Sequence, residues 1–384
     1  MKNLLLASTA LIALAGAASA EVALSGTGRM GLVYDQDNGT PSVDDQGNPE
    51  YIVLEDGTLV QGVDSEMRFS SRMRLLISMS FESDLGLTFG GSFRADNAAD
   101  ANEGLAGTVF VSGDFGKLEM GDVSSAAEAA VGNISGVGYT GLGDPNETFY
   151  LVTGGPGLSN DDNFQGLALP GVLYTYTTGD ISLYLGLGNP TGVTVGYDTT
   201  TVLGAAAGKF EGVVVNAGDT LESYNQVSLG AAYATDQYSV GIGFESATFR
   251  FDVAETTNAA GQVVTQAIYA KNTMDAWYLG GSATFGDAVV KAMWGQVSDI
   301  DYQQYGLSLD YTFDAFTATV FVRQQDLGER YDYYGNLKDS VDQTIWGIGG
   351  SYDLGAGLVI AGGVIDPDLA IEDYRADFGV NFEF

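Results

Sequence analysis

Apolar and polar side chains alternate with a period of two residues over most of this chain. Between residues 68 and 82 the odd positions are mostly apolar, whereas the even positions are mostly arginine, serine and glutamate. This period puts alternate side chains on opposite faces of a β-strand. No run beyond residue 20 approaches the roughly 18 apolar residues that a membrane helix requires. The alternation therefore predicts an all-β protein.

The alternating segments predict sixteen strands. They lie near 22–34, 66–82, 86–94, 107–113, 117–122, 169–178, 181–189, 223–234, 238–250, 274–285, 288–297, 303–313, 315–324, 342–353, 357–364 and 372–384. Short turns, such as 83–85 and 114–116, alternate with longer polar stretches, such as 35–65 and 123–168. Strands of about ten residues with short turns at one end and long loops at the other are typical of outer-membrane β-barrels.

Three architectures contain many alternating strands. A soluble sandwich or propeller buries the apolar face in a protein core, whereas a membrane barrel turns that face to lipid. A repeat solenoid needs a fixed period of about 20–50 residues, and the chain has none. The sequence favours a 16-stranded antiparallel transmembrane β-barrel, and a secreted soluble all-β binding protein or an Asp/Glu-based enzyme is the alternative.

The first 20 residues have the pattern of a cleaved signal peptide. Lys2 provides the positive start, residues 4–15 are apolar, and Ala18-Ser19-Ala20 matches a cleavage site before Glu21. The sequence therefore predicts export, with residues 21–384 as one barrel domain.

Composition excludes several functions. The chain contains no cysteine and no histidine, so it cannot build a Cys nucleophile, a Ser-His unit or a His/Cys zinc site. Its net charge of −35 argues against binding of nucleic acid. We expect no enzymatic activity and no required cofactor. Acidic loops could still bind Ca²⁺, which prefers oxygen ligands, although no loop has EF-hand spacing.

Five bases share the polar parity of the first three long strands. They are Arg29, Arg68, Arg72, Arg74 and Arg94. An arginine facing lipid near mid-bilayer costs about 2–4 kcal/mol, so these side chains are predicted to face the lumen as a basic wall.

The connection 122–168 is the longest in the chain. Loops of this length are uncommon unless they are functional or disordered. Residues 124–131 are alanine-rich and could form one or two helical turns, and residues 132–143 are rich in glycine and uncharged. If this third loop folds into the barrel, its acids face the basic wall. These acids are Asp122, Glu128, Asp144 and Glu147.

Three segments carry a family resemblance. The turn and strand at 113–121 (GDFGKLEMG), the segment 20–26 (AEVALSG) and the terminal VNFEF resemble general diffusion porins of Gram-negative bacteria, especially alphaproteobacterial members. The resemblance implies a sixteen-stranded barrel, a homotrimer, and a third loop folded inward so that its acids face an arginine cluster across a pore eyelet. Asp122 departs from the family pattern, in which a basic residue commonly follows this glycine. The terminal Phe384 resembles the family's signal for the outer-membrane assembly machinery.

Together, these observations predict a channel in the bacterial outer membrane, in contact with lipid and lipopolysaccharide, for passive diffusion of small hydrophilic solutes and ions. Acid-rich mouths concentrate cations, so weak cation selectivity is expected. A substrate-specific channel is the alternative to a general diffusion channel, because the arginine stripe is too short to distinguish the two.

Overall fold

The computed structural model describes residues 21–35, 51–53, 59–61, 66–96, 107–151, 171–188, 192–194, 220–253, 256–257, 263–265, 268–298, 302–326, 330–331, 337–338, 342–368 and 374–384. The predicted signal peptide, most of the predicted first loop and the end of the predicted third loop, from residue 152 onward, lie outside these residues.

One large antiparallel sheet contains seventeen strands in the described part of the chain. Sixteen form the barrel, and the short β10 (Gly192–Thr194) pairs with β11 beyond the end of β9. The barrel strands are β1 (Glu21–Asp35), β4 (Glu66–Glu82), β5 (Thr88–Asp96), β6 (Gly107–Gly113), β7 (Gly116–Gly121), β8 (Gly171–Thr178), β9 (Ile181–Gly188), β11 (Thr220–Ala234), β12 (Tyr238–Val253), β15 (Ile268–Phe285), β16 (Ala288–Val297), β17 (Tyr302–Phe313), β18 (Phe316–Asp326), β21 (Asp342–Gly355), β22 (Leu358–Asp366) and β23 (Arg375–Glu383). Short hairpins are formed by β2 (Tyr51–Val53) with β3 (Leu59–Gln61), β13 (Thr256–Thr257) with β14 (Val263–Thr265), and β19 (Arg330–Tyr331) with β20 (Leu337–Lys338).

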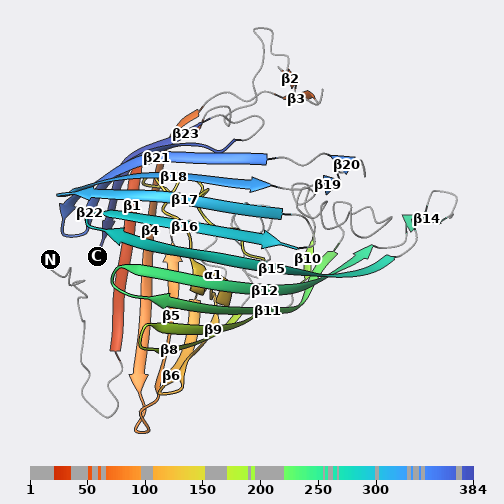
Figure 1. Ribbon diagram of the computed structural model, residues 1–384, viewed down its shortest axis with the longest axis horizontal. Helices are drawn as coiled ribbons and strands as arrows, with labels where there is room; N and C mark the ends of the chain where they lie inside the picture. The colour runs from red at the N-terminus through yellow and green to blue at the C-terminus, as the bar shows by residue number, and fades with distance from the viewer. Residues whose placement is uncertain are drawn as a thin grey trace.

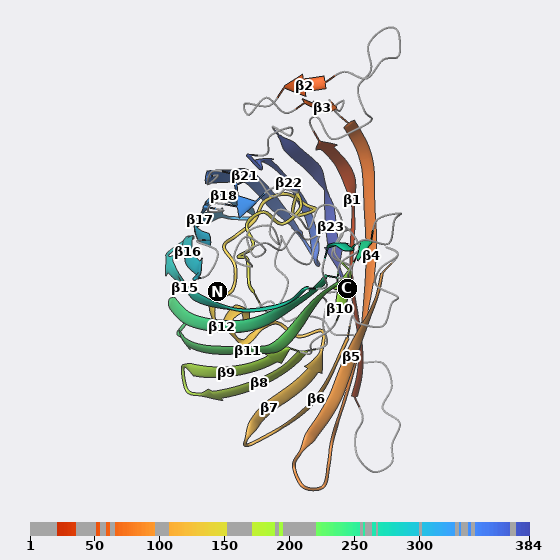
Figure 2. The ribbon, with the colours of Figure 1, turned by 90° about the vertical axis from the view of Figure 1, so that its right-hand side faces the viewer.

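The sheet closes on itself (Figure 1). β1 pairs along its whole length with β4 and also pairs with β23, from Thr27↔Glu383 to Asp35↔Arg375. Closure leaves no unpaired strand edge, which is the condition for a sheet to cross hydrocarbon. The predicted 16-stranded antiparallel barrel is confirmed. Viewed from another side, the chain segment that contains the third loop lies inside the ring of strands (Figure 2).

The apolar parity of the strands faces outward. Leu183, Leu185 and Leu187 of β9 are all 42–47% exposed, and the alternate Gly186 lies inside the barrel, where a Cβ atom would meet Ala126 of the third loop. β17 repeats the pattern with Leu307 and Leu309. A continuous exposed apolar face is stable only against an apolar solvent, so this surface is the lipid-facing band.

The strands that flank the connection between β12 and β15 are longer than the sequence predicted. Alternation ends near residue 250 and resumes near 274, yet β12 and β15 stay paired as far as Val253↔Ile268. Backbone pairing does not require one face to be apolar, so the two strands continue beyond the segments in which the alternation predicted them. The predicted boundary at 274 was therefore wrong by six residues.

One helix, α1 (Ala126–Val131), interrupts the sheet within the described residues. No helix in this part of the chain is long and apolar enough to cross a membrane.

Candidate functional site: the loop-lined pore

The third loop enters the lumen through α1, the one or two helical turns that the sequence predicted. Ser125 caps the helix by accepting a hydrogen bond from the backbone N–H of Glu128 at 3.0 Å, and the N–H of Ala126 donates to Ser228 Oγ of β11 at 2.9 Å. Ala126 and Ala127 are completely buried. The helix is therefore held against the inner wall.

Glycines in the wall make this close approach feasible. A Cβ atom on Gly243 of β12 would lie 2.6 Å from the Cβ of Ala127, and one on Gly230 of β11 would lie 2.8 Å from the Cβ of Ala130. Such separations are shorter than van der Waals contact, so only glycine fits at these wall positions. Some of the chain's 54 glycines therefore make room for the alanine-rich helix against the wall.

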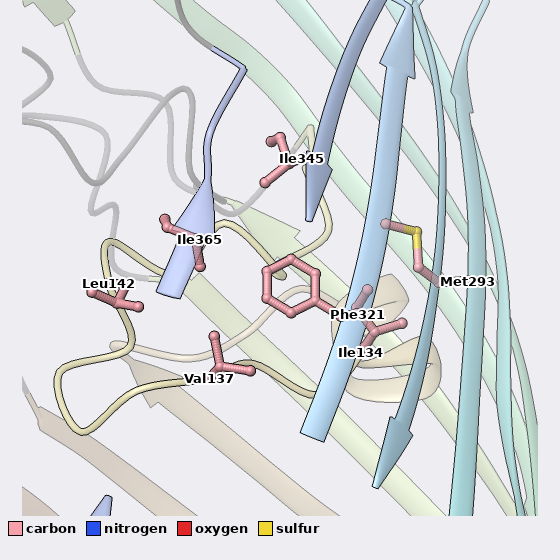
Figure 3. Packing of buried hydrophobic residues seen from close by; sticks show 7 residues of the cluster. All are labelled: Ile134, Val137, Leu142, Met293, Phe321, Ile345 and Ile365. Atoms are coloured by element: carbon pink, nitrogen blue, oxygen red, sulfur yellow. The ribbon is translucent and has the colours of Figure 1, made fainter. Parts of the chain in front are cut away.

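An apolar cluster attaches the next part of the loop to the wall (Figure 3). Ile134, Val137 and Leu142 of the loop pack with Met293, Phe321, Ile345 and Ile365, which project inward from β16, β18, β21 and β22. All seven side chains are at most 5% exposed. At about 25 cal/mol for each Å² of buried apolar surface, a cluster of this kind stabilises the docked loop by several kcal/mol.

The tip of the loop reaches the strands at which the barrel closes. Asp377 of β23 accepts hydrogen bonds from the N–H of Tyr139 (3.1 Å), the N–H of Thr140 (2.7 Å) and the hydroxyl of Thr140 (2.6 Å). Arg29 Nη1 of β1 donates to the carbonyl of Thr140 at 2.8 Å. The tip is thus fixed from both sides of the β1–β23 seam.

The returning segment is held by three wall side chains. Gln304 of β17 clamps Phe149, since its Oε1 accepts from the Phe149 N–H (3.0 Å) and its Nε2 donates to the Phe149 carbonyl (2.7 Å). The N–H of Leu151 donates to Glu245 Oε2 and to the hydroxyl of Tyr278. These contacts come from β12, β15 and β17. The segment 149–151 therefore returns along the same wall against which α1 packs.

Arg323 of β18 connects the wall to the acidic part of the loop. It is 2% exposed, and it donates from Nη1 to the carbonyl of Pro145 (3.3 Å) and from Nη2 to Gln304 (2.9 Å) and Gln325 (3.1 Å). Because its guanidinium donates to several acceptors at once, Arg323 holds this part of the loop in a fixed position against β17 and β18.

Asp144 lies on the loop within electrostatic reach of the arginines of the first strands. Burial raises the pKa of Asp144, while Arg29, Arg72 and Arg74 act in the opposite direction. The register explains their grouping, because Arg29 is directly opposite Arg72 and Thr27 is directly opposite Arg74. Like charges that face each other across strands are destabilising, and a nearby carboxylate offsets their repulsion.

Glu147 lies among other acids of the same loop. Burial, together with the charges of Asp144 and Glu128, raises the pKa of Glu147 to about 7, and Arg323 opposes the shift. Carboxylates this close cannot all be ionised without a large cost, so the negative charge of the loop varies near neutral pH.

The structure thus groups six of the nine candidate residues, namely Arg29, Arg72, Arg74, Glu128, Asp144 and Glu147. Arg68 lies nearer the long-loop end, where it forms a 2.8 Å ion pair with Asp35, and Arg375 approaches the same carboxylate at 3.9 Å. Arg94 is opposite Leu76, on the wall next to Arg74. Asp122 follows the end of β7 and is exposed, with its backbone N–H donating to Gly107.

Sequence reasoning missed the wall residues that hold the loop, above all Asp377, Glu245, Gln304 and Arg323. A signal was present, because each is a polar residue on the lumen parity of a predicted strand. The signal does not say which loop atom each one meets, since Thr140 and Asp377 are 237 residues apart in sequence.

A closed barrel with an internal loop matches known proteins. The family model described as Gram-negative porin matches residues 7–365. The porin of Rhodobacter capsulatus is 34% identical over 95% of this chain and 100% of its own length. The chain belongs to the Gram-negative porin family. The porin of Fuscovulum blasticum is 28% identical over 95% of this chain and all of its own length.

Solved structures agree with this membership. A porin structure refined at 1.8 Å resolution has a TM-score of 0.61 at 30% identity, covering 95% of this porin and all of the other chain. A mutant form of the Rh. blastica porin has a TM-score of 0.55 at 23% identity, covering 94% and 100%, which shows the fold alone. The protein is an outer-membrane diffusion channel, as predicted. The alternative of a secreted soluble β-protein was wrong, and family and fold point to a channel instead of an enzyme.

In the described residues, no group of three or more acidic side chains is arranged to hold a metal ion. Most acids of the predicted first loop lie outside those residues.

Proposed function

We propose that this porin passes small hydrophilic solutes and ions through an eyelet in which a basic wall faces an acidic loop, with a weak preference for cations. The observation that supports this most directly is the position of Asp144, whose carboxyl interacts with Arg29, Arg72 and Arg74. Glu128 and Glu147 add acids on the same loop.

Such an arrangement acts through a transverse electric field. Bases on one side and acids on the other orient water and polar solutes, and the low-dielectric barrel reduces screening. A hydrophilic solute exchanges hydrogen bonds with this ordered water, whereas an apolar solute has to displace it and passes poorly. Because no chemical group has to be recognised, the field selects for polarity and size.

The preference for cations follows from the balance of charges. The chain has 50 acidic and 15 basic residues, so the mouths of the pore attract counter-ions. For the reconstituted protein in a KCl gradient across a planar bilayer, we expect a reversal potential with the sign that indicates selectivity for K⁺ over Cl⁻. Clear anion selectivity would refute the charge argument and leave the diffusion channel intact.

The range of solutes is tested with liposomes. We expect swelling rates that fall smoothly with the size of the sugar and do not depend on its stereochemistry. If the liposomes swell with a single class of sugar only, the protein is instead the substrate-specific channel that the sequence did not exclude.

We further propose a homotrimer in contact with outer-membrane lipid and lipopolysaccharide. The broad apolar outer surface supports the lipid contact. Phe384, whose backbone pairs with Gly26 at the seam, is proposed as the assembly signal. Native mass spectrometry in detergent tests the trimer, and deletion of Phe384 tests assembly, with loss of barrel insertion as the expected result.

Calcium binding by the acidic loops stays a prediction. If Ca²⁺ is bound, chelation should lower the thermal midpoint of the reconstituted protein. An unchanged midpoint would contradict it.

A further inference from the structure

A cavity of about 400 Å³ lies in the inner wall, between the short turns and the arginines of the pore. It is formed by the inward faces of β1, β4, β5, β6 and β7. Cavities of about 300–1,000 Å³ are typical of small-molecule sites. None of the lining residues that the structure describes belongs to the third loop, and the cavity opens to the lumen.

Four of the eleven residues that line this cavity carry a hydroxyl group, namely Ser78, Ser80, Ser92 and Thr108. Ser78, Ser92 and Thr108 are consecutive neighbours across β4, β5 and β6, so their hydroxyls form one row on the lumen face. Ser80 stands in the next row, directly opposite Glu21 of β1. Directly opposite side chains on one face have Cβ atoms about 4.5–5.5 Å apart, so a single ligand can contact several of them.

One side of the cavity is already ordered by its own interactions. Glu119 accepts from Lys117 Nζ at 2.7 Å and from Thr108 Oγ1 at 2.8 Å, and Thr108 is 3.3 Å from Ser92 Oγ. Lys117 also lies 4.7 Å above the ring of Phe110. These contacts fix the carboxylate of Glu119 without using all of its lone pairs, which is the pre-organisation that favours binding.

The other side offers groups that the protein itself does not use. The hydroxyls of Ser78 and Ser80 and the carboxylate of Glu21 face the cavity, and none of them has a hydrogen-bond partner among the described residues. Hydroxyls both donate and accept, whereas carboxylates only accept. A complementary ligand therefore carries many hydroxyl groups. Lys117 is the one basic side chain among the described lining residues and is paired with Glu119, so the cavity does not favour an anion.

The position of the cavity matters for transport. Ser92 is two residues from Arg94 along β5, which places it about 7 Å from the arginine row toward the short turns. A solute that has passed the arginines meets these hydroxyls next.

We propose that this cavity is a binding subsite for a neutral polyhydroxylated solute of the sugar type, on the short-turn side of the loop. The subsite holds such a solute briefly after the constriction and replaces the water that it lost there. This inference rests on the diffusion channel and is independent of its cation selectivity.

The test is single-channel recording of the full-length reconstituted protein in KCl, with glucose added to either side. Poly(ethylene glycol) dimethyl ether of similar size serves as the control solute, because its ether oxygens accept hydrogen bonds and it has no hydroxyl that could donate to a carboxylate. We expect glucose to produce current noise that saturates with concentration, and we expect none from the polymer. Equal effects of the two solutes would overturn the proposal, and so would noise from glucosamine alone, which would indicate attraction of a cation.

Matched variants locate the effect. The double variant Ser78→Ala, Ser80→Ala should raise the half-saturating glucose concentration at least about fivefold, which corresponds to about 1 kcal/mol. Ser25→Ala removes a hydroxyl from the same wall outside the cavity and should leave it unchanged. If the double variant and Ser25→Ala both behave like the parent protein, the cavity is not the site. Reversal potentials from the same bilayers report cation selectivity separately, so either proposal can fail alone.

Discussion

Removal of the Asp377 carboxylate should release the tip of the third loop. Asp377 is 7% exposed and accepts three hydrogen bonds from Tyr139 and Thr140. Hydrogen bonds to a charged group contribute about 1.5–3 kcal/mol each, so three bonds together contribute at most about 4.5–9 kcal/mol. Water in the lumen replaces part of them after Asp377→Ala. We therefore expect a net loss of roughly 3 kcal/mol, which shifts the equilibrium between docked and released tip by about two orders of magnitude.

The absence of cysteine from the chain makes this shift measurable. Val137 packs in the apolar cluster and is 5% exposed, so Val137→Cys introduces one protected thiol. In Asp377→Ala, a thiol reagent should label this cysteine about 100-fold faster, if labelling is proportional to the released population. Single-channel currents of the same variant should fluctuate more, because the tip crosses the conducting path.

The matched control is Glu383→Ala, which removes a carboxylate from the lumen face of the same strand at a distance from the loop. It should label at the parental rate. If Asp377→Ala also labels at the parental rate, the apolar cluster and the other hydrogen bonds from the wall hold the loop without Asp377, and the electrostatic anchor is not needed.

Three further predictions concern the loop and its wall. Because the pKa of Glu147 is about 7, this side chain is neutral below and negative above that value, so cation selectivity should rise between about pH 6 and pH 8 in reversal-potential measurements, and Glu147→Gln should remove the rise. Arg74→Ser deletes one charge from the basic wall and should increase the permeability of cations relative to anions; an unchanged ratio would place Arg74 outside the selective region. Gly243→Leu should clash with Ala127 and cost about 1–3 kcal/mol, seen as a lower urea midpoint in detergent, whereas an unchanged midpoint would show that α1 can move away.

The barrel could be predicted from the sequence because the alternation that indicates each strand lies within the strand itself. A strand that separates lipid from water has to alternate, and all sixteen segments with this period became barrel strands. The edges of β12 and β15 were not predicted, since their backbone pairing continues beyond the segments in which the alternation was recognised.

The contents of the barrel were harder to predict. The helical turn of α1 was visible in its alanines, and the inward course of the loop came from family resemblance. Its anchors depend on the barrel register, which brings Thr140 beside Asp377 and Ala127 beside Gly243. No local pattern carries that information. The chain contains 54 glycines, but only the tertiary structure shows that some of them make room for α1.

Interruptions of the alternation do contain part of the missing information. Phe321 is on the lumen parity, between the outward Val320 and Val322, and an apolar side chain there would face water in an empty barrel. Met293, Ile345 and Ile365 interrupt nearby strands in the same way, and the loop covers all four. One interruption is not sufficient, since Leu76 shares this parity on β4 and remains 38% exposed. Apolar residues on the lumen parity of several neighbouring strands at one level therefore mark the surface to which an internal loop is bound, because only burial under such a loop makes them stable.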